Sequence, residues 1–173
     1  MTRVSVIGCG NMGGALLRGL ARAEGYHLTA IDLDPEALAA IEDAVDETTE
    51  DVAAARDADI VVLAVKPDVA PAVLEDLGLR ADQQLVTLAA GLPRGFVAER
   101  TEAPVVRIMP NLAAETGDMA AAATNEGLTD EVRAMLDAVG EFVEVDESLM
   151  HVSTAVNGSG PAFVFYLIGA MQQ

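Results

Sequence analysis

The stretch VSVIGCGNMGGALLRGL, residues 4–20, carries the clearest indication of how this chain folds. A β-branched run over residues 3–8 predicts a strand, and apolar residues at helical spacing predict a helix over residues 11–23. Between the two, glycines at positions 8, 10 and 13 have the spacing G-x-G-x-x-G. A strand that passes through such a loop directly into a helix is typical of the first unit of a doubly wound α/β fold.

In a phosphate-binding turn, each glycine of this loop would have its own physical role. Gly8 allows a sharp turn, Gly10 allows a pyrophosphate to approach the backbone, and Gly13 allows close contact between helix and strand. The helix N-terminus adds unpaired N–H groups and the positive end of its dipole. We therefore expect a dinucleotide-binding loop; a turn whose glycines serve only packing is the alternative.

An acidic residue stands where such loops meet a ribose. Asp32 lies 19 positions after Gly13, at the end of a second predicted strand (27–34), and Asp34 follows it. A carboxylate there accepts hydrogen bonds from both ribose hydroxyls and repels a 2′-phosphate, so NAD(H) is favoured over NADP(H). The alternative is that Asp32 is one more surface acid in an acidic chain.

Composition restricts the partners and the compartment. The 173 residues carry a net charge of −18, which argues against nucleic acid and anionic membranes as partners. Lys66 is the only lysine among ten basic residues, so we expect the composition of a halophilic archaeon, with an ordinary acidic protein as the alternative. Cys9 is the only cysteine, and the apolar run 162–171 is far short of the roughly 20 residues of a membrane helix. We expect a cytoplasmic chain.

Predicted strands and helices alternate along the rest of the chain, which indicates a Rossmann-type, doubly wound, mostly parallel sheet over residues 1–146. Residues 147–173 differ, with two apolar helical stretches broken by NGSGP, and predict the start of an all-helical domain. The further strands are expected at 59–65, 84–90, 103–110, 117–125 and 141–145, and the further helices at 35–43, 48–58, 66–77, 93–101 and 129–140.

Four more motifs accompany the loop GCGNMG: LAVKP (63–67), LAAGLP (88–93), RIMPN (107–111) and GSGPAFVF (158–165). In this order and spacing the chain resembles the pyrroline-5-carboxylate reductase family over essentially its whole length. The resemblance implies hydride transfer from NAD(P)H to the C=N bond of 1-pyrroline-5-carboxylate, giving L-proline. Two other readings stay open. One is a coenzyme F420-dependent NADP reductase, against which Asp32 and GSGPA argue, and the other is a dinucleotide-binding module without catalysis.

The resemblance also implies the site residues. No catalytic side chain and no metal are expected, because solution or substrate can supply the proton of the imine nitrogen. Lys66, the single lysine, stands at a strand tip, which favours a role at the site over chance survival. The expected cofactor-binding residues are Ile7, Gly8, Cys9, Gly10, Asn11, Met12, Gly13, Asp32, Asp34, Asp51, Ala64, Val65, Lys66, Pro67, Ala89, Ala90 and Gly91, and the expected substrate-binding residues are Asn111, Glu147, Gly158 and Ser159.

The chain also departs from the family pattern. Leu112 and Ala113 follow Asn111 where the family has Thr-Pro, Asn157 replaces a usual serine, and Gly169 replaces a usual glutamate. The family continues beyond residue 173 with helices that dimerise and carry backbone donors for the substrate carboxylate. We therefore expect a homo-oligomer through the C-terminal helices in the full-length form. The present chain is expected to be an inactive fragment, or to complete its site by pairing.

Overall fold

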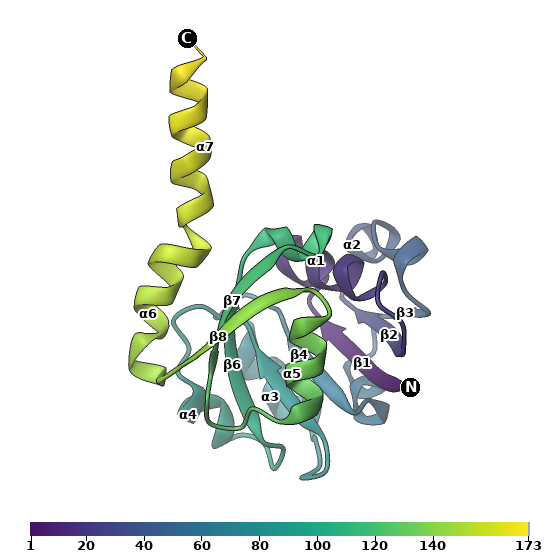
Figure 1. The fold of residues 1–173 in the computed structure, drawn as a ribbon. Helices are drawn as coiled ribbons and strands as arrows, with labels where there is room; N and C mark the ends of the chain where they lie inside the picture. The colour runs from purple at the N-terminus through teal and green to yellow at the C-terminus, as the bar shows by residue number, and fades with distance from the viewer. Residues whose placement is uncertain (173) are drawn as a thin grey trace.

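An eight-stranded sheet organises the computed structural model, which describes residues 1–172 (Figure 1). The strand order is β3-β2-β1-β4-β5-β6-β7-β8. All pairings from β3 to β6 are parallel, β6 and β7 are antiparallel, and β7 and β8 are parallel. The predicted doubly wound, mostly parallel sheet is confirmed. The strands are β1 (Thr2–Ile7), β2 (Tyr26–Ile31), β3 (Glu47–Thr49), β4 (Ile60–Leu63), β5 (Gln84–Thr87), β6 (Val105–Pro110), β7 (Met119–Thr124) and β8 (Gly140–Val145).

Helices cover both faces of the sheet. Successive residues of a strand point to opposite faces, so the apolar residues of the central strands pack against helices on both sides. Val62 and Val86 pack on the face with α1 (Asn11–Leu20) and α5 (Asp130–Asp137), whereas Val61 and Leu85 pack on the face with α3 (Ala70–Leu77) and α4 (Arg94–Ala98). The central strands are therefore apolar at nearly every position. The remaining helix of this part, α2 (Pro35–Ala39), follows β2.

The predicted helix over residues 48–58 is wrong. Residues 47–49 form β3 and pair in parallel with β2, and a 3₁₀ segment, Val52–Asp57, follows them. The Asp51 carboxylate accepts a hydrogen bond from the Ala53 N–H and caps that segment. The sequence has a threonine suited to cap a helix, followed by small residues, and this pattern favours a helix. In the structure Thr48 instead pairs with the free edge of β2, and this pairing outweighs the local helix preference.

The tail leaves the sheet as helical turns and ends in an arm. A 3₁₀ turn (Glu147–Leu149), α6 (Met150–Ser153), a single wide π turn (Thr154–Gly158) and α7 (Gly160–Met171) follow β8. The arm formed by α7 projects away from the sheet, and none of its residues is buried (Figure 1). Among the described residues, no helix is both long enough and apolar enough to cross a membrane.

Candidate dinucleotide site

The loop between β1 and α1 lies where the chain order of the sheet reverses. From β1 the chain runs outward to β2 and β3, then returns to β4 on the other side of β1. In open α/β sheets, ligands bind at such a switch point, outside the carboxyl ends of the strands. The loop, together with the segments after β4 and β5, lines this edge.

Gly8 and Gly10 have opposite surroundings. Gly8 has φ +95°, and a Cβ there would lie 2.8 Å from the Ala64 carbonyl carbon, so only glycine fits this contact between loop and β4. A Cβ on Gly10 would meet nothing within 4 Å. Packing therefore does not demand the glycine at position 10, whereas a close approach by a phosphate would.

The first turn of α1 has the features of an anion-binding helix N-terminus. Its N-cap residue is Gly10, no side chain caps the helix, and no acidic residue stands in its first turn. A Cβ on Gly13 would lie 1.9 Å from the Gly8 carbonyl oxygen, so helix and loop are in direct contact. The residues present thus fit a pyrophosphate, with a bare backbone at Gly10 and helical N–H groups behind it.

Asp32 holds the loop from the end of β2. One carboxylate oxygen accepts from the Cys9 N–H at 2.6 Å, and the other accepts from the Asp34 N–H at 2.9 Å. The Asp34 side chain caps α2 through the Glu36 N–H. Burial, together with the nearby Asp32 charge, raises the pKa of the Cys9 thiol to about 12. The thiol therefore stays protonated at neutral pH and serves as a small filler.

A narrow apolar slot of about 110 Å³ opens beside the loop. It lies between the ends of β1 and β2 and the segments that follow β3 and β4. Sequence reasoning missed six of its residues, although the valines that follow the strand predicted over residues 59–65 are a usable signal. It also expected Asp51, which the structure places in a cap, while Glu50 lines the slot. The lining residues are Ile7, Gly8, Ile31, Asp32, Leu33, Glu50, Val52, Val65, Val69 and Val73.

The segments after β4 and β5 extend the same edge. Ala64 and Val65 touch the glycine loop, whereas Lys66 and Pro67 are exposed at the approach to α3. After β5, Ala89 is buried, and Gly91 turns the chain with φ +78° toward α4. The remaining expected residue, Ala90, is exposed between them.

Asn111, at the end of β6, is tied to the π turn of the tail. Its amide nitrogen lies 3.5 Å from the Asn157 Oδ1, and its own Oδ1 accepts from the Ala120 N–H. The Asn157 amide donates to the carbonyls of Met109 and Ala120 at 2.8 and 2.7 Å. Gly158 and Ser159 follow directly and are exposed. These contacts hold the tail at the same edge of the sheet as the glycine loop.

Glu147 lies in an ion pair that sequence reasoning did not foresee. Its Oε1 accepts from the Arg107 Nη1 at 2.7 Å and from the Arg94 N–H at 3.1 Å. Arg107, in β6, is only 2% exposed. Its Nε and Nη2 and the Glu147 Oε2 are buried without a hydrogen-bond partner. The first acid of the tail thereby fixes the tail to β6 and to the start of α4, and the buried arginine within RIMPN was the missed signal.

Comparisons with known proteins agree with this geometry. Residues 3–91 match the family described as NADP oxidoreductase, coenzyme F420-dependent. The chain is 38% identical to the pyrroline-5-carboxylate reductase of Mycobacterium leprae, over 99% of this chain and 64% of the relative. It is 34% identical to that of Methanosarcina acetivorans, over 98% of this chain and 68% of the relative. A crystal structure of Plasmodium falciparum pyrroline carboxylate reductase with NADP bound superposes with a TM-score of 0.86 at 25% identity, covering 98% of this chain and 67% of that one.

The sheet order, the switch-point loop and the bare Gly10 define a dinucleotide-binding protein of the Rossmann type. The similarity extends over nearly the whole chain, beyond the half matched by the F420-dependent family. The chain belongs to the pyrroline-5-carboxylate reductase family. It spans about two thirds of the length of these relatives.

Proposed function

We propose that this chain is the cofactor-binding body, with the first helices of the tail, of a pyrroline-5-carboxylate reductase. The enzyme would reduce the C=N bond of 1-pyrroline-5-carboxylate to give L-proline. The single observation that carries the proposal is Gly10, whose bare backbone faces open space at a switch-point helix N-terminus. The family's similarity over the tail supports the substrate assignment.

Different segments of the chain would bind different parts of the cofactor and the substrate. The glycine loop and the first turn of α1 would hold the pyrophosphate, and the slot beside Val52 and Val69 would take the adenine. The segments 64–67 and 89–91 would border the nicotinamide, which supplies the hydride when bound. Asn111, Glu147, Gly158 and Ser159 would position the substrate. The protein then contributes placement and exclusion of water rather than a strong acid or base.

NAD(H) is the cofactor that the charges favour. Asp32 and Glu50 both line the slot, and the Asp34 N–H donates a hydrogen bond to the Asp32 carboxylate. A 2′-phosphate would enter next to these carboxylates, whereas ribose hydroxyls can donate to them. NADP(H) remains the competing cofactor, since the Plasmodium falciparum relative was crystallised with it.

The compartment and the assembly are proposed from two features, the net charge and the arm α7. The charge of −18 with a single lysine supports a cytoplasm of high ionic strength, where salt screens the repulsion within the chain. The apolar arm α7, none of whose residues is buried, supports self-association through the C-terminal helices.

A second candidate is a dinucleotide-binding module without catalysis. The observation favouring it is that no residue of α7 is buried, so among residues 1–172 no segment encloses this part of the tail. Calorimetry with NADH and NADPH in low and high salt, followed by turnover of 1-pyrroline-5-carboxylate, separates the two. Binding with turnover supports the reductase, binding without turnover supports the module, and no binding of either cofactor contradicts both.

A further inference from the structure

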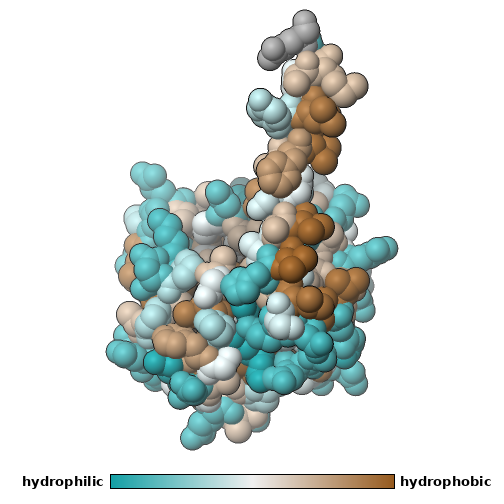
Figure 2. Space-filling model, turned by 90° about the vertical axis from the view of Figure 1, so that its left-hand side faces the viewer, coloured by the Kyte–Doolittle hydropathy of each residue, from teal (hydrophilic) through white to brown (hydrophobic). Residues whose placement is uncertain are grey.

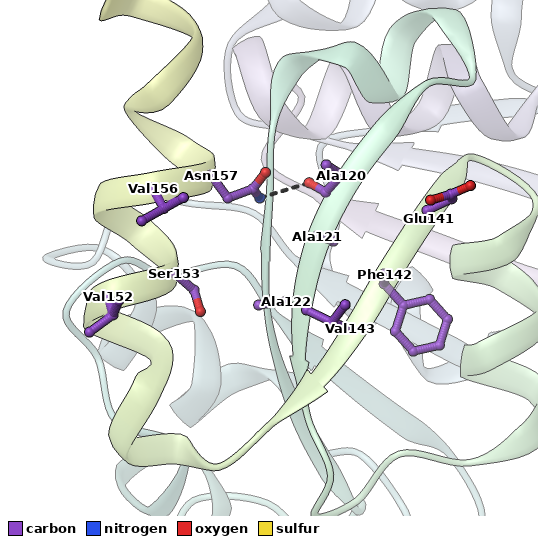
Figure 3. A pocket seen from close by; sticks show the side chains of 10 residues that line it. All are labelled: Ala120, Ala121, Ala122, Glu141, Phe142, Val143, Val152, Ser153, Val156 and Asn157. Atoms are coloured by element: carbon purple, nitrogen blue, oxygen red, sulfur yellow. Dashed lines mark hydrogen bonds between the residues drawn. The ribbon is translucent and has the colours of Figure 1, made fainter.

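Acidic side chains are common on this chain, so an acid is informative only where its position is specific. Hydrophilic residues cover much of the body in the view of Figure 2, and 28 of the 173 residues are acidic. The groove of about 420 Å³ between β7, β8 and the tail nevertheless has a single acid, Glu141, among its ten lining residues (Figure 3). The slot beside the glycine loop has only about 110 Å³, yet it is lined by two acids, Asp32 and Glu50.

Glu50 lies level with Asp32 at the ends of two paired strands. Ile31 of β2 and Thr49 of β3 are partners in the parallel ladder, and the Asp32 N–H donates to the Thr49 carbonyl at 3.2 Å. Asp32 and Glu50 are the residues that follow these two partners in the chain. Because neighbouring strands lie about 4.8 Å apart, the two carboxylates reach the slot from adjacent positions.

The two carboxylates differ in what they already bind. Each oxygen of Asp32 accepts a backbone N–H, one from Cys9 and the other from Asp34. Among residues 1–172, no ion pair involves Glu50, and no basic side chain lines the slot. Asp32 therefore holds the glycine loop in place, whereas the oxygens of Glu50 are available to a ligand.

The chemistry of a free carboxylate selects between the two nicotinamide cofactors. An ionised carboxylate only accepts hydrogen bonds, and the ribose hydroxyls of NAD(H) can donate them. A phosphate monoester on the 2′ oxygen, as in NADP(H), replaces one of these donors with about 1.5 to 2 negative charges at pH 7. A slot with two carboxylates and no basic side chain gives that phosphate no favourable partner.

We propose that Glu50 is a specificity-determining residue of this site: its carboxylate accepts a ribose hydroxyl of NAD(H) and repels the 2′-phosphate of NADP(H). The inference rests on the cofactor site proposed above, and it assigns a role to β3, whose pairing with β2 brings Glu50 level with Asp32. It does not depend on turnover, so it stands or falls separately from the reductase assignment.

Salt gives this selection a signature. Glu50 is exposed, so mobile ions screen its repulsion of a phosphate. The Debye length falls from about 10 Å at 0.1 M salt to about 3 Å at 1 M. The preference of the wild-type chain for NADH over NADPH should therefore decrease as the KCl concentration rises, and this decrease should be smaller in a chain that lacks the Glu50 charge.

Calorimetry with NADH and NADPH on the 173-residue chain, in about 0.1 M and 1 M KCl, tests the proposal. The two cofactors differ only at the 2′ position, so the ratio of their Kd values reports on that position alone. At the lower salt, Glu50→Gln should raise the affinity for NADPH relative to NADH at least fivefold, or about 1 kcal/mol. Glu42→Gln is the matched control, the same change at an exposed acid outside the slot, and its ratio should equal that of wild type.

A second variant asks for a gain of affinity, which a damaged fold cannot produce. Glu50→Lys places a cation where the 2′-phosphate enters, so this variant should bind NADPH more tightly than wild type does. An unchanged ratio in Glu50→Gln, or an equal change in Glu42→Gln, overturns the proposal. A wild-type chain that binds NADPH at least as tightly as NADH also overturns it and leaves the dinucleotide site standing, whereas no binding of either cofactor overturns both.

Discussion

Exchanging single glycines of the loop for alanine separates a structural glycine from a ligand-binding one. Gly10 has φ −66° and ψ −160°, an extended conformation that alanine adopts, and a Cβ there meets nothing within 4 Å. Gly8 has φ +95°, and a Cβ there lies within 2.9 Å of three backbone atoms of Ala64 and Val65. The same chemical change therefore has opposite consequences two residues apart.

The magnitudes follow from these surroundings. For Gly8→Ala, backbone strain of about 1–3 kcal/mol and overpacking of about 1–3 kcal/mol add to a loss of roughly 2–6 kcal/mol in unfolding free energy. For Gly10→Ala, the free energy of unfolding should stay within about 0.5 kcal/mol of wild type. Its methyl group would stand where the phosphate approaches, so the Kd for NADH should rise at least tenfold, or about 1.4 kcal/mol.

Chemical denaturation and calorimetry with NADH measure the two quantities on the same protein. Gly169→Ala is the matched control, because a Cβ there also meets nothing and the residue lies in the distant arm. That control should bind NADH as wild type does. A stable Gly10→Ala chain with unchanged NADH affinity would refute the argument that open space at Gly10 is reserved for a phosphate.

Four further outcomes are expected. Asp32→Asn removes a charge beside the ribose and keeps an oxygen for the Cys9 N–H, so the affinity for NADPH relative to NADH should rise by about fivefold, or ~1 kcal/mol; an unchanged ratio in calorimetry would contradict the role of Asp32. Because the pKa of Cys9 is raised from 9.0 to about 12, the folded state holds the proton more tightly, so this contribution to stability is complete below pH 9 and is lost between pH 9 and about 12. Cys9→Ala should flatten the fall in unfolding free energy over that range, and an identical slope would show that the thiol is not the cause. Glu147→Gln leaves the buried Arg107 without a charged partner; since Glu147 is partly exposed, the loss should be about 2–3 kcal/mol, below the usual cost of breaking a fully buried pair. A double-mutant cycle with Arg107→Met measures the coupling, and strict additivity would argue against the pair. Finally, the midpoint of thermal unfolding should rise with KCl concentration because salt screens a charge of −18, and a flat response would contradict the high-salt assignment.

Local sequence patterns were enough to predict the central strands of the sheet and the glycine loop. The apolar strand over residues 60–63 is explained by burial of both faces of a parallel sheet. Among the loop glycines, Gly8 turns the chain with positive φ, and Gly13 lies too close to the Gly8 carbonyl for any side chain. Even the shared edge could be predicted, since LAVKP, LAAGLP and RIMPN each stand at the end of a predicted strand and parallel strands end together. The local sequence could not predict β3, because the pairing depends on the open edge of β2.

Neighbouring residues and their spacing were thus enough to predict the fold class and the family, and the phosphate loop is a prediction of the same kind. The roles that depend on distant partners could be assigned only from the tertiary contacts. The tertiary structure placed Glu147 against the buried Arg107, 40 residues away in the chain, and Asn157 between the carbonyls of β6 and β7. It also left the apolar helix α7 exposed, because among the described residues the segment in contact with it is chiefly the adjoining π turn.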